Sequence, residues 1–267
     1  IGDFLLTCPA IGRLKEQGSV DVLGQPNRIA LALLGGVADA VHDYERTEWH
    51  SVFSTPTDRL VQFLQHFDRA VVWMRDEGQI LHQLQKCGIR DVRMFPGLPP
   101  QGWNKHASQY YLETLGMKSA SPFALDVDPV VPGYDVLIAP GSGGIHKNWP
   151  LDEYLNLAIR FQQEGRSVTW ILGPAEEKIQ LPAEVRVLPA MSLCELASVL
   201  ASARLYVGND SGISHLAAAT GCPAVVLFGP TDPVVWRPLG RKVVCVKGVP
   251  WPCVDEVLDN VKQVEQN

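Results

Sequence analysis

Short apolar runs alternate with helical patterns throughout the second half of the chain, and this alternation most constrains how the chain can fold. The helical patterns are amphipathic or rich in alanine. The predicted strands cover 135–139, 168–172, 185–188, 205–207, 224–228 and 243–246, and the predicted helices cover 151–164, a short 176–181 segment, 192–203, 213–220 and a last one from about 254. Strands and helices that alternate over short connections predict βαβ units and a parallel sheet. Because the strands are almost continuously apolar, we expect helices on both faces of that sheet.

The first half repeats this pattern less regularly. Strands are predicted at 20–23, 40–44, 70–74 and 92–95, with helices at 4–17, 28–34, 59–66, 79–87 and 106–115. The segment 122–133 contains three prolines and is typical of an interdomain linker. Two similar α/β domains joined by a linker place the expected active site in the cleft between them. The opening helix has no strand before it, so we expect residues upstream of Ile1 to carry the first strand.

Composition excludes several classes of protein. The 267 residues are 46% hydrophobic, which is too rich in core-forming side chains for a disordered chain. The formal net charge is −6 and no basic cluster is present, so the sequence argues against broad nucleic-acid binding. The six cysteines form no CxxC pair, which indicates buried thiols in a reducing compartment. No membrane span or signal peptide is predicted, and we expect a cytoplasmic protein.

The most informative segment is the glycine-bounded turn at 208–212, between the apolar run 205–207 and an alanine-rich helix. Free N–H groups and the positive end of the helix dipole make such a turn an anion site suited to a diphosphate. In the plainer interpretation, Asp210 or Ser211 caps the helix, and both roles can hold together. His215, one turn into the helix, could bond a phosphate, although a lone histidine there is more often structural.

A second glycine-rich loop follows the strand at 135–139 and contains Gly141, Ser142, Gly143 and Gly144, with Lys147 placed before the next helix. The spacing of a Walker A loop is missing, but the unpaired amides, the hydroxyl and the cation are the same physical parts. Taken alone, the loop is weak evidence for a phosphate site, and in the plainer interpretation Lys147 is a solvated loop lysine. Two such loops at adjacent strand ends together predict a pocket for a nucleoside diphosphate.

Two further positions admit both a structural and a functional interpretation. Asp3 stands where a helix begins, and we favour an N-cap over a base that takes a proton from an incoming hydroxyl. Thr231 follows the strand at 224–228 at the same sheet edge, where it could line the pocket, although turn chemistry alone explains this segment. Asp126 and Asp128 form a DxD pattern inside the proline-rich linker, and we predict no metal site there.

These segments resemble the ADP-heptose:lipopolysaccharide heptosyltransferases, glycosyltransferase family 9. The resemblance rests on Ile1-Gly-Asp-Phe-Leu-Leu-Thr, Pro140-Gly-Ser-Gly-Gly with Lys147-Asn-Trp-Pro, Gly208-Asn-Asp-Ser-Gly with His215-Leu-Ala-Ala-Ala, and Phe228-Gly-Pro-Thr-Asp-Pro. It implies a GT-B fold of the α/β class, with two Rossmann-like parallel-sheet domains facing a central cleft. Residues 1–128 would form the acceptor-binding domain, without its first strand, and residues 129–267 the donor-binding domain.

The resemblance also implies an activity, which is inverting transfer of a heptose from ADP-heptose to the inner core of lipopolysaccharide. This acceptor is lipid-anchored, so the enzyme would work at the cytoplasmic face of the inner membrane, with peripheral membrane contact. The ADP-sugar is a substrate, and no cofactor and no metal are implied.

The implied roles can be assigned to particular residues. Asp3 matches the general base, and Ser142, Gly143 and Lys147 match contacts to the donor phosphates, with Gly144 in the same loop. The donor loop corresponds to Asp210, Ser211, Gly212 and His215. Glu176 matches an acidic residue that holds the ribose hydroxyls, and Met191 lies near the expected adenine wall.

Three alternatives remain open at this point. The chain could be a GT-B transferase for another sugar nucleotide, a non-catalytic nucleotide-sugar binding module, or a structural α/β protein whose glycine loops are only turns. Anionic ligands on a chain of net charge −6 would need local positive groups. In the first half, Arg13, Arg46 and Arg59 are candidates for that role.

Overall fold

The computed structural model describes residues 1–173, 176 and 179–266. Each predicted strand and helix has a counterpart whose bounds lie within two residues, apart from the predicted 176–181 segment, which includes residues that are not described. The short helix at 233–236 and the 3₁₀ turns at 49–53 and 145–147 were not predicted. The strands are β1 (Asp21–Gly24), β2 (Ala40–Asp43), β3 (Arg69–Trp73), β4 (Asp91–Phe95), β5 (Val136–Ala139), β6 (Val168–Trp170), β7 (Arg186–Val187), β8 (Leu205–Asn209), β9 (Ala224–Phe228) and β10 (Val243–Lys247). The α-helices are α1 (Gly2–Lys15), α2 (Pro26–Leu34), α3 (Asp58–Leu64), α4 (Gln79–Lys86), α5 (Ala107–Thr114), α6 (Leu151–Gln163), α7 (Leu193–Ala201), α8 (Gly212–Ala219), α9 (Pro233–Trp236) and α10 (Val254–Glu265), with 3₁₀ turns η1 (Trp49–Phe53) and η2 (Ile145–Lys147).

The chain forms two compact units. The C-terminal unit comprises Ile1–Pro9 and Ala120–Asn267, and the N-terminal unit comprises Ala10–Ser119. The first part of α1 therefore belongs to the C-terminal unit, although it lies at the start of the sequence. The proline-rich segment belongs to the same unit, because Phe123 and Leu125 are buried and the amide of Leu125 donates to Ala219 O at 2.7 Å.

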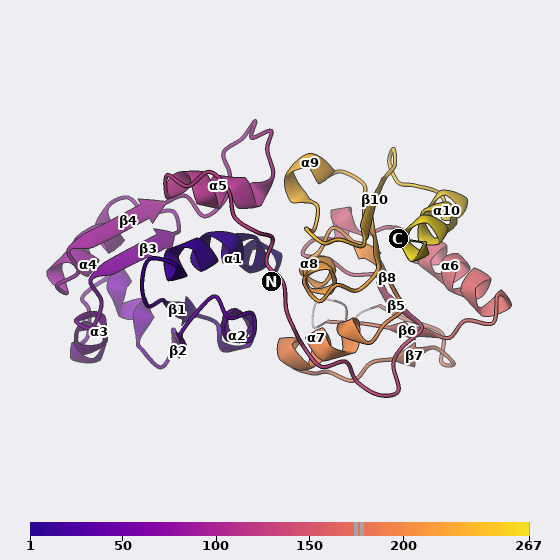
Figure 1. The fold of residues 1–267 in the computed structure, drawn as a ribbon, viewed down its shortest axis with the longest axis horizontal. Coiled ribbons are helices and arrows are strands. Elements are labelled where there is room, and N and C mark those ends of the chain that lie inside the picture. The colour runs from indigo at the N-terminus through magenta and orange to yellow at the C-terminus, as the bar shows by residue number, and fades with distance from the viewer. Residues whose placement is uncertain (174–175, 177–178, 267) are drawn as a thin grey trace. The chain divides into compact units, whose positions relative to one another are not determined.

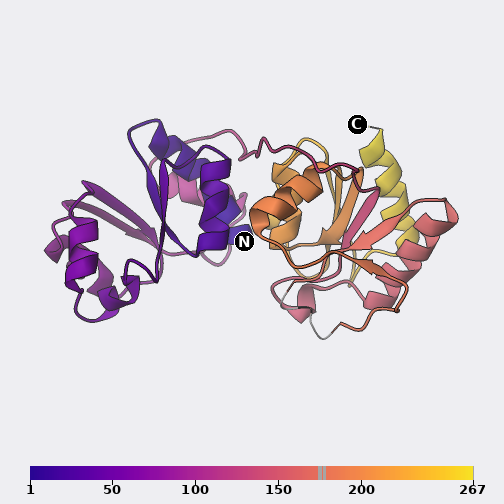
Figure 2. The same cartoon turned by 90° about the horizontal axis from the view of Figure 1, so that it is seen from below.

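The C-terminal unit is built on one parallel sheet. Over the described residues the strand order is β10-β9-β8-β5-β6-β7, and every neighbouring pair is parallel. From β5 the chain moves outward to β6 and β7, and it then returns to add β8 on the other side of β5. Helices α6 and α10 cover one face of the sheet, and α7 and α8 cover the other (Figures 1 and 2). This arrangement confirms the predicted parallel sheet with helices on both faces.

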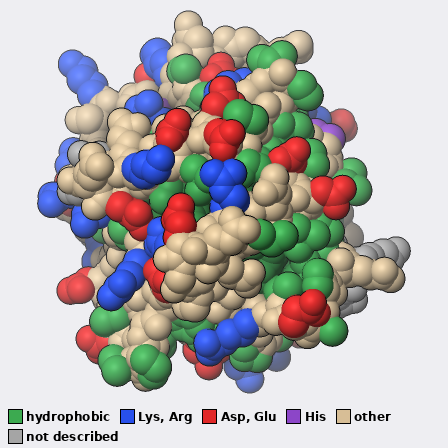
Figure 3. Space-filling model, turned by 90° about the vertical axis from the view of Figure 1, so that its right-hand side faces the viewer, with side chains coloured by type: hydrophobic (Ala, Val, Ile, Leu, Met, Phe, Trp, Pro, Cys, Tyr) green, Lys and Arg blue, Asp and Glu red, His purple; other side chains and the backbone are tan. Residues whose placement is uncertain are grey.

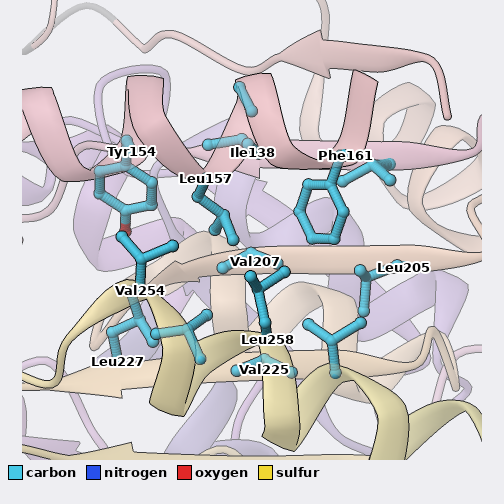
Figure 4. Close-up of a cluster of buried hydrophobic side chains, with 14 of the residues drawn as sticks. Ile138, Tyr154, Leu157, Phe161, Leu205, Val207, Val225, Leu227, Val254 and Leu258 are labelled. Carbon is cyan, nitrogen blue, oxygen red and sulfur yellow. The ribbon is translucent and has the colours of Figure 1, made fainter. Parts of the chain in front are cut away.

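The main hydrophobic core lies between this sheet and helices α6 and α10 (Figure 4). Tyr154, Leu157 and Phe161 recur at helical spacing along α6 and are fully buried, so one stripe of the helix faces the strands. Val207 and Val225 face them from the central strands. The apolar runs that predicted the strands are therefore the runs that this core buries.

The N-terminal unit pairs its strands into two parallel sheets. β1 pairs with β2, and β3 pairs with β4. In the described part of the unit, β1 and β3 are not hydrogen-bonded to each other, so the strands do not form one continuous sheet. A core of residues from α3, α4 and neighbouring loops, which includes Leu60, Ile80 and Leu84, packs against β3 and β4. The βαβ order predicted from the sequence is confirmed.

The cysteines and the surface charges fit an ordinary globular chain with reduced thiols. All six cysteines are free, and burial raises the pKa of Cys222 to about 12, which keeps this thiol protonated. The prediction of buried thiols holds for Cys8, Cys87 and Cys222, whereas Cys194 and Cys245 are half-buried and Cys253 is exposed. Positive and negative side chains are interspersed on the face seen in Figure 3. Within the described residues, each helix is too short or too polar to cross a membrane.

Replacing Leu157 by alanine tests the main core. Leu157 is fully buried between α6 and the sheet, so Leu157→Ala should lower the free energy of unfolding by roughly 2–5 kcal/mol. Urea unfolding measures this change. Ile159 on the same helix is 51% exposed, and Ile159→Ala should change stability by about 0.5 kcal/mol or less. Equal losses in the two variants would contradict the assigned core.

Candidate nucleotide-binding site

Most of the predicted site residues lie in loops at one edge of the C-terminal sheet. In a parallel sheet the carboxyl ends of all strands meet at the same edge, and β9, β8, β5 and β6 are consecutive neighbours. The loops after these four strands contain Thr231, the 208–212 turn, the 141–147 loop and Glu176. The chain reverses its direction of strand addition between β5 and β8, and ligands of open α/β sheets bind at such a switch point.

Helix α8 begins at the end of the turn that follows β8, as the sequence predicted. Ser211 is the N-cap, and its hydroxyl accepts a hydrogen bond from the amide of Ser214 at 3.4 Å. Of the two residues considered for the cap, Ser211 therefore takes that position. The first amides of α8 point out of the helix at this end, where they and the helix dipole favour an anion. His215 is buried within the same helix.

Lys147 and Asp210 join the two glycine-rich loops across the switch point. The Lys147 ammonium lies 3.2 Å from the main-chain oxygen of Asp210 and 3.4 Å from its carboxylate oxygen Oδ2. The Asp210 side chain is only 8% exposed and that of Lys147 is 24% exposed. The alternative interpretation of Lys147 as a solvated loop lysine is therefore wrong, because its ammonium is held at the start of α8.

The serine of the β5 loop is engaged within its own loop. The Ser142 hydroxyl lies 2.8 Å from the main-chain oxygen of Gly144 and 2.6 Å from Oδ1 of Asn148. It also accepts a hydrogen bond from the amide of Gly144 at 3.3 Å. Open space surrounds the position of a Cβ on Gly143. Ser142 thus shapes the loop, and Gly143 leaves its backbone open to a ligand.

Glu176 lies over the same loop. Its carboxylate oxygen Oε2 accepts a hydrogen bond from the amide of Gly173 at 2.8 Å, and a Cβ on Gly141 would overlap this carboxylate. Glycine at 141 is therefore what allows the acidic side chain to approach. Met191 is half-buried between β7 and α7, farther along the same sheet edge.

The turn after β9 is anchored by a lysine that the sequence analysis did not identify. The Lys247 ammonium donates to the main-chain oxygen of Thr231 at 2.8 Å and also to that of Gly229. The Thr231 hydroxyl is buried and, among the described residues, has no hydrogen-bond partner. A buried hydroxyl without a partner costs free energy, so Thr231 has hydrogen-bonding capacity that the described residues do not use.

The first residues of the chain lie against the start of α8. A Cβ on Gly212 would lie 2.6 Å from Cβ of Ile1 and 2.8 Å from the amide nitrogen of Gly2. A Cβ on Gly2 would in turn lie 3.3 Å from Cδ2 of His215. The contact requires glycine at 212, because a side chain there would overlap the first two residues, whereas a Cβ on Gly2 would be a tight fit.

This contact changes the interpretation of Asp3. Helix α1 begins at Gly2, so Asp3 lies inside its first turn and the favoured prediction of an N-cap is wrong. Asp3 is exposed, and within the described part of the chain its carboxylate has no hydrogen bond or ion pair. The contact of Gly2 with Gly212 brings the first turn of α1, which contains Asp3, close to the turn that begins α8.

Asn209 is a second residue that the sequence analysis missed. It is fully buried at the end of β8; its side-chain amide donates to the main-chain oxygen of Pro140 at 2.7 Å and accepts from the amide of Trp149 at 2.9 Å. One side chain therefore ties both ends of the loop that contains Lys147 to the strand that precedes the 208–212 turn. An asparagine that ends an otherwise apolar strand was the signal that could have identified it.

Candidate metal ligands do not gather anywhere in the part of the chain that the structure describes. No group of three or more His, Cys, Asp or Glu side chains is arranged there to hold an ion. Positive groups that the described residues place at this sheet edge include Lys147, Lys247 and the amino end of α8.

Comparison with known proteins identifies relatives for most of this chain. The family model of glycosyltransferase family 9 (heptosyltransferase) matches residues 97–262. Lipopolysaccharide heptosyltransferase 1 of Pseudomonas aeruginosa is 34% identical over 171 residues, which cover 58% of this chain and 48% of that protein. Lipopolysaccharide heptosyltransferase 1 of Salmonella typhimurium is 57% identical over 93 residues, which cover 33% and 29%. The chain thus spans about half, or less, of the length of the curated relatives it matches.

Solved structures extend the similarity over nearly the whole chain. Escherichia coli ADP-heptose lipopolysaccharide heptosyltransferase II superposes with a TM-score of 0.80 at 17% identity, covering 99% of this chain and 94% of that one. The E. coli heptosyltransferase WaaC with ADP gives 0.70 at 19% identity, covering 98% and 96%. These similarities confirm the predicted α/β fold of the GT-B type with two Rossmann-like domains.

Removing the Asn209 side chain tests whether it holds the loop. Asn209→Ala leaves Pro140 O and the Trp149 amide without their partner, so the free energy of unfolding should fall by about 1–3 kcal/mol for each unpaired group. Hydrogen exchange at the Trp149 amide should become faster. Asn156 is exposed on α6, and Asn156→Ala should leave both measurements almost unchanged. Unchanged exchange at Trp149 in Asn209→Ala would contradict the assignment.

Proposed function

The chain belongs to glycosyltransferase family 9, and on this premise we propose that it moves a heptose from ADP-heptose to the inner core of lipopolysaccharide, with inversion at the anomeric carbon. One observation carries the proposal. The Lys147 ammonium and the amino end of α8 lie together at the β5–β8 switch point, where a diphosphate would bind.

The proposed donor contacts follow from the charges at this edge. An ammonium has three donors, and two of those of Lys147 face the Asp210 oxygens, which leaves one for a phosphate oxygen. The first amides of α8, from Gly212 onward, supply further donors along the helix dipole. Gly143 and Gly144 have no side chains, so the backbone of the loop after β5 could approach the same anion. These groups offset the charge of the departing ADP, so the proposal requires no metal.

The nucleoside would lie farther along the sheet edge. One Glu176 oxygen already accepts from Gly173, and the carboxylate retains acceptor capacity for the two ribose hydroxyls. Met191 would contact the adenine ring as part of its apolar wall, and Thr231 would offer its buried hydroxyl to the phosphate side of the site. His215 would support the same turn from inside α8.

Asp3 is the proposed general base. Its carboxylate would accept the proton of the acceptor hydroxyl while that oxygen forms a bond to the anomeric carbon. The bond from this carbon to the diphosphate oxygen breaks through an oxocarbenium-like state, and ADP leaves as an anion held by Lys147 and α8. The observation that supports this role is the contact of Gly2 with Gly212, which brings the turn containing Asp3 against the donor turn.

The domain roles are part of the same proposal. Residues 129–267 would bind the donor and residues 1–128 the acceptor, with the opening segment of the chain contributing its base to the donor side. A lipopolysaccharide acceptor is anchored in a bilayer, so the proposed site of action is the cytoplasmic face of the inner membrane, reached by peripheral contact.

Lys147→Ala tests the donor site. A hydrogen bond to a charged group is worth about 1.5–3 kcal/mol, so the variant should bind ADP about tenfold more weakly or worse in calorimetry. Lys262, exposed on α10, provides the matched control, and Lys262→Ala should keep the original affinity. ADP should bind in preference to UDP and GDP. A preference for UDP would overturn the donor assignment, and failure to bind any nucleotide would overturn the proposed function.

Asp3→Asn tests the base while preserving the shape of the side chain. Loss of a general base should lower kcat for heptose transfer about 10²–10⁴-fold and leave the Kd for ADP unchanged. Asp255→Asn removes a charge from the first turn of another helix and should leave kcat unchanged. If kcat is unchanged in Asp3→Asn, Asp3 is not the base.

A further inference from the structure

A lysine at the end of β10 holds the turn at 229–232, which lies between β9 and α9. The Lys247 ammonium donates to the main-chain oxygen of Thr231 at 2.8 Å and also to that of Gly229. β10 pairs with β9 in parallel, with Lys247 opposite Phe228. The ammonium therefore lies at the same edge of the sheet as the loops of the candidate nucleotide-binding site.

An indole ring supports the same turn. A Cβ on Gly229 would lie 2.5 Å from the ring of Trp251, so glycine at this position is what allows the turn and the ring to approach. The chain turns back tightly to place this ring, because a Cβ on Gly248 would lie 1.9 Å from the main chain of residues 251–252. The turn is thus held by an ammonium on its carbonyls and by an aromatic ring against its first residue.

The segment 247–252 also contacts the loop after β5. The buried indole of Trp149 donates to the main-chain oxygen of Pro252 at 2.9 Å. The main-chain amide of Trp149 donates to Asn209, which also holds the other end of that loop. The segment 247–252 therefore joins the turn after β9 to the loop that contains Lys147.

A bond to the carbonyls of a turn also orients its hydrogen-bond donors. In a planar trans peptide the N–H points away from the C=O. The Thr231 carbonyl faces Lys247, so the Asp232 amide points the opposite way, and over the described residues this amide has no hydrogen-bond partner. The Asp232 carboxylate is engaged as the N-cap of α9, where it accepts from the amide of Val234 at 2.9 Å. The turn therefore carries two unused donors, this amide and the buried Thr231 hydroxyl.

We propose that Lys247 is a positioning residue for the donor site. By holding the carbonyls of Gly229 and Thr231, it directs the Thr231 hydroxyl and the Asp232 amide to a phosphate oxygen of the donor, and it does not itself contact the nucleotide. Two of the three N–H groups of its ammonium are committed to these carbonyls. The inference deepens the proposed function and rests on it, because it takes an ADP-sugar as the ligand of this sheet edge.

Lys247→Met tests this role, because it removes the ammonium and keeps an unbranched side chain. In the nucleotide-free chain, amide hydrogen exchange at Thr231 and Asp232 should become faster, because the turn loses its tether. Calorimetry should show ADP binding about fivefold weaker or worse. Lys247→Arg should recover part of this affinity, because a guanidinium also has N–H groups for both carbonyls.

Lys242 provides the matched control. It is exposed and lies directly before β10, at the opposite end of this strand from Lys247. Lys242→Met should therefore leave both the exchange at the turn and the affinity for ADP unchanged. The amide spectrum of each variant shows whether it is folded.

A double-mutant cycle separates positioning from an independent contact with ADP. Thr231→Val removes the hydroxyl and should weaken ADP binding about fivefold. It should not lower the stability of the nucleotide-free chain, because over the described residues this hydroxyl has no partner to lose. If Lys247 acts through the turn, the double variant should bind ADP more tightly than the product of the two single effects predicts.

Three results would overturn the positioning role: unchanged exchange at Thr231 and Asp232 in Lys247→Met, unchanged affinity for ADP in this variant, or single effects that multiply in the double variant. If the original chain and Lys247→Met bind ADP equally well, only this inference fails. If the original chain binds no nucleotide, the proposed function fails, and the positioning role fails with it.

Discussion

The parallel pairing of β5 with β8 is the constraint on which the candidate site depends. These two strands lie side by side, but the chain adds β6 and β7 between them in sequence. Their carboxyl ends therefore present two loops, distant in sequence, to the same space. Asn209 holds this junction from inside by bonding to Pro140 and Trp149, so that Lys147 meets Asp210 at the start of α8.

The charge of the site is local, and this explains how a chain of net charge −6 can be suited to a diphosphate. A helix end and a half-buried ammonium act over a few ångströms in a region of low dielectric, where the net charge of the surface matters little. An anion site of this kind depends on positive groups placed beside the ligand, so it does not need a basic domain.

The sequence predicted the strands and helices better than it predicted the contacts of individual side chains. Strand and helix positions followed from apolar periodicity, because the residues that a strand or a helix buries recur in the sequence at the spacing of that element. Ser211 was one of two residues proposed for the α8 cap and takes that position, whereas Asp3 is not a cap, because α1 begins one residue before it. Lys247 was missed because its partners, the carbonyls of the turn after β9, carry no sequence signature.

The sequence by itself determined the α/β class, the parallel strands and the two glycine-rich loops, since each depends on local spacing of apolar residues and glycines. Only the tertiary structure decided that Lys147 is held by Asp210, that Gly2 lies against Gly212, and that β1–β2 and β3–β4 pair as separate sheets. The physical reason is that these contacts join segments far apart in the chain. Their geometry depends on strand order and helix packing, which periodicity does not encode.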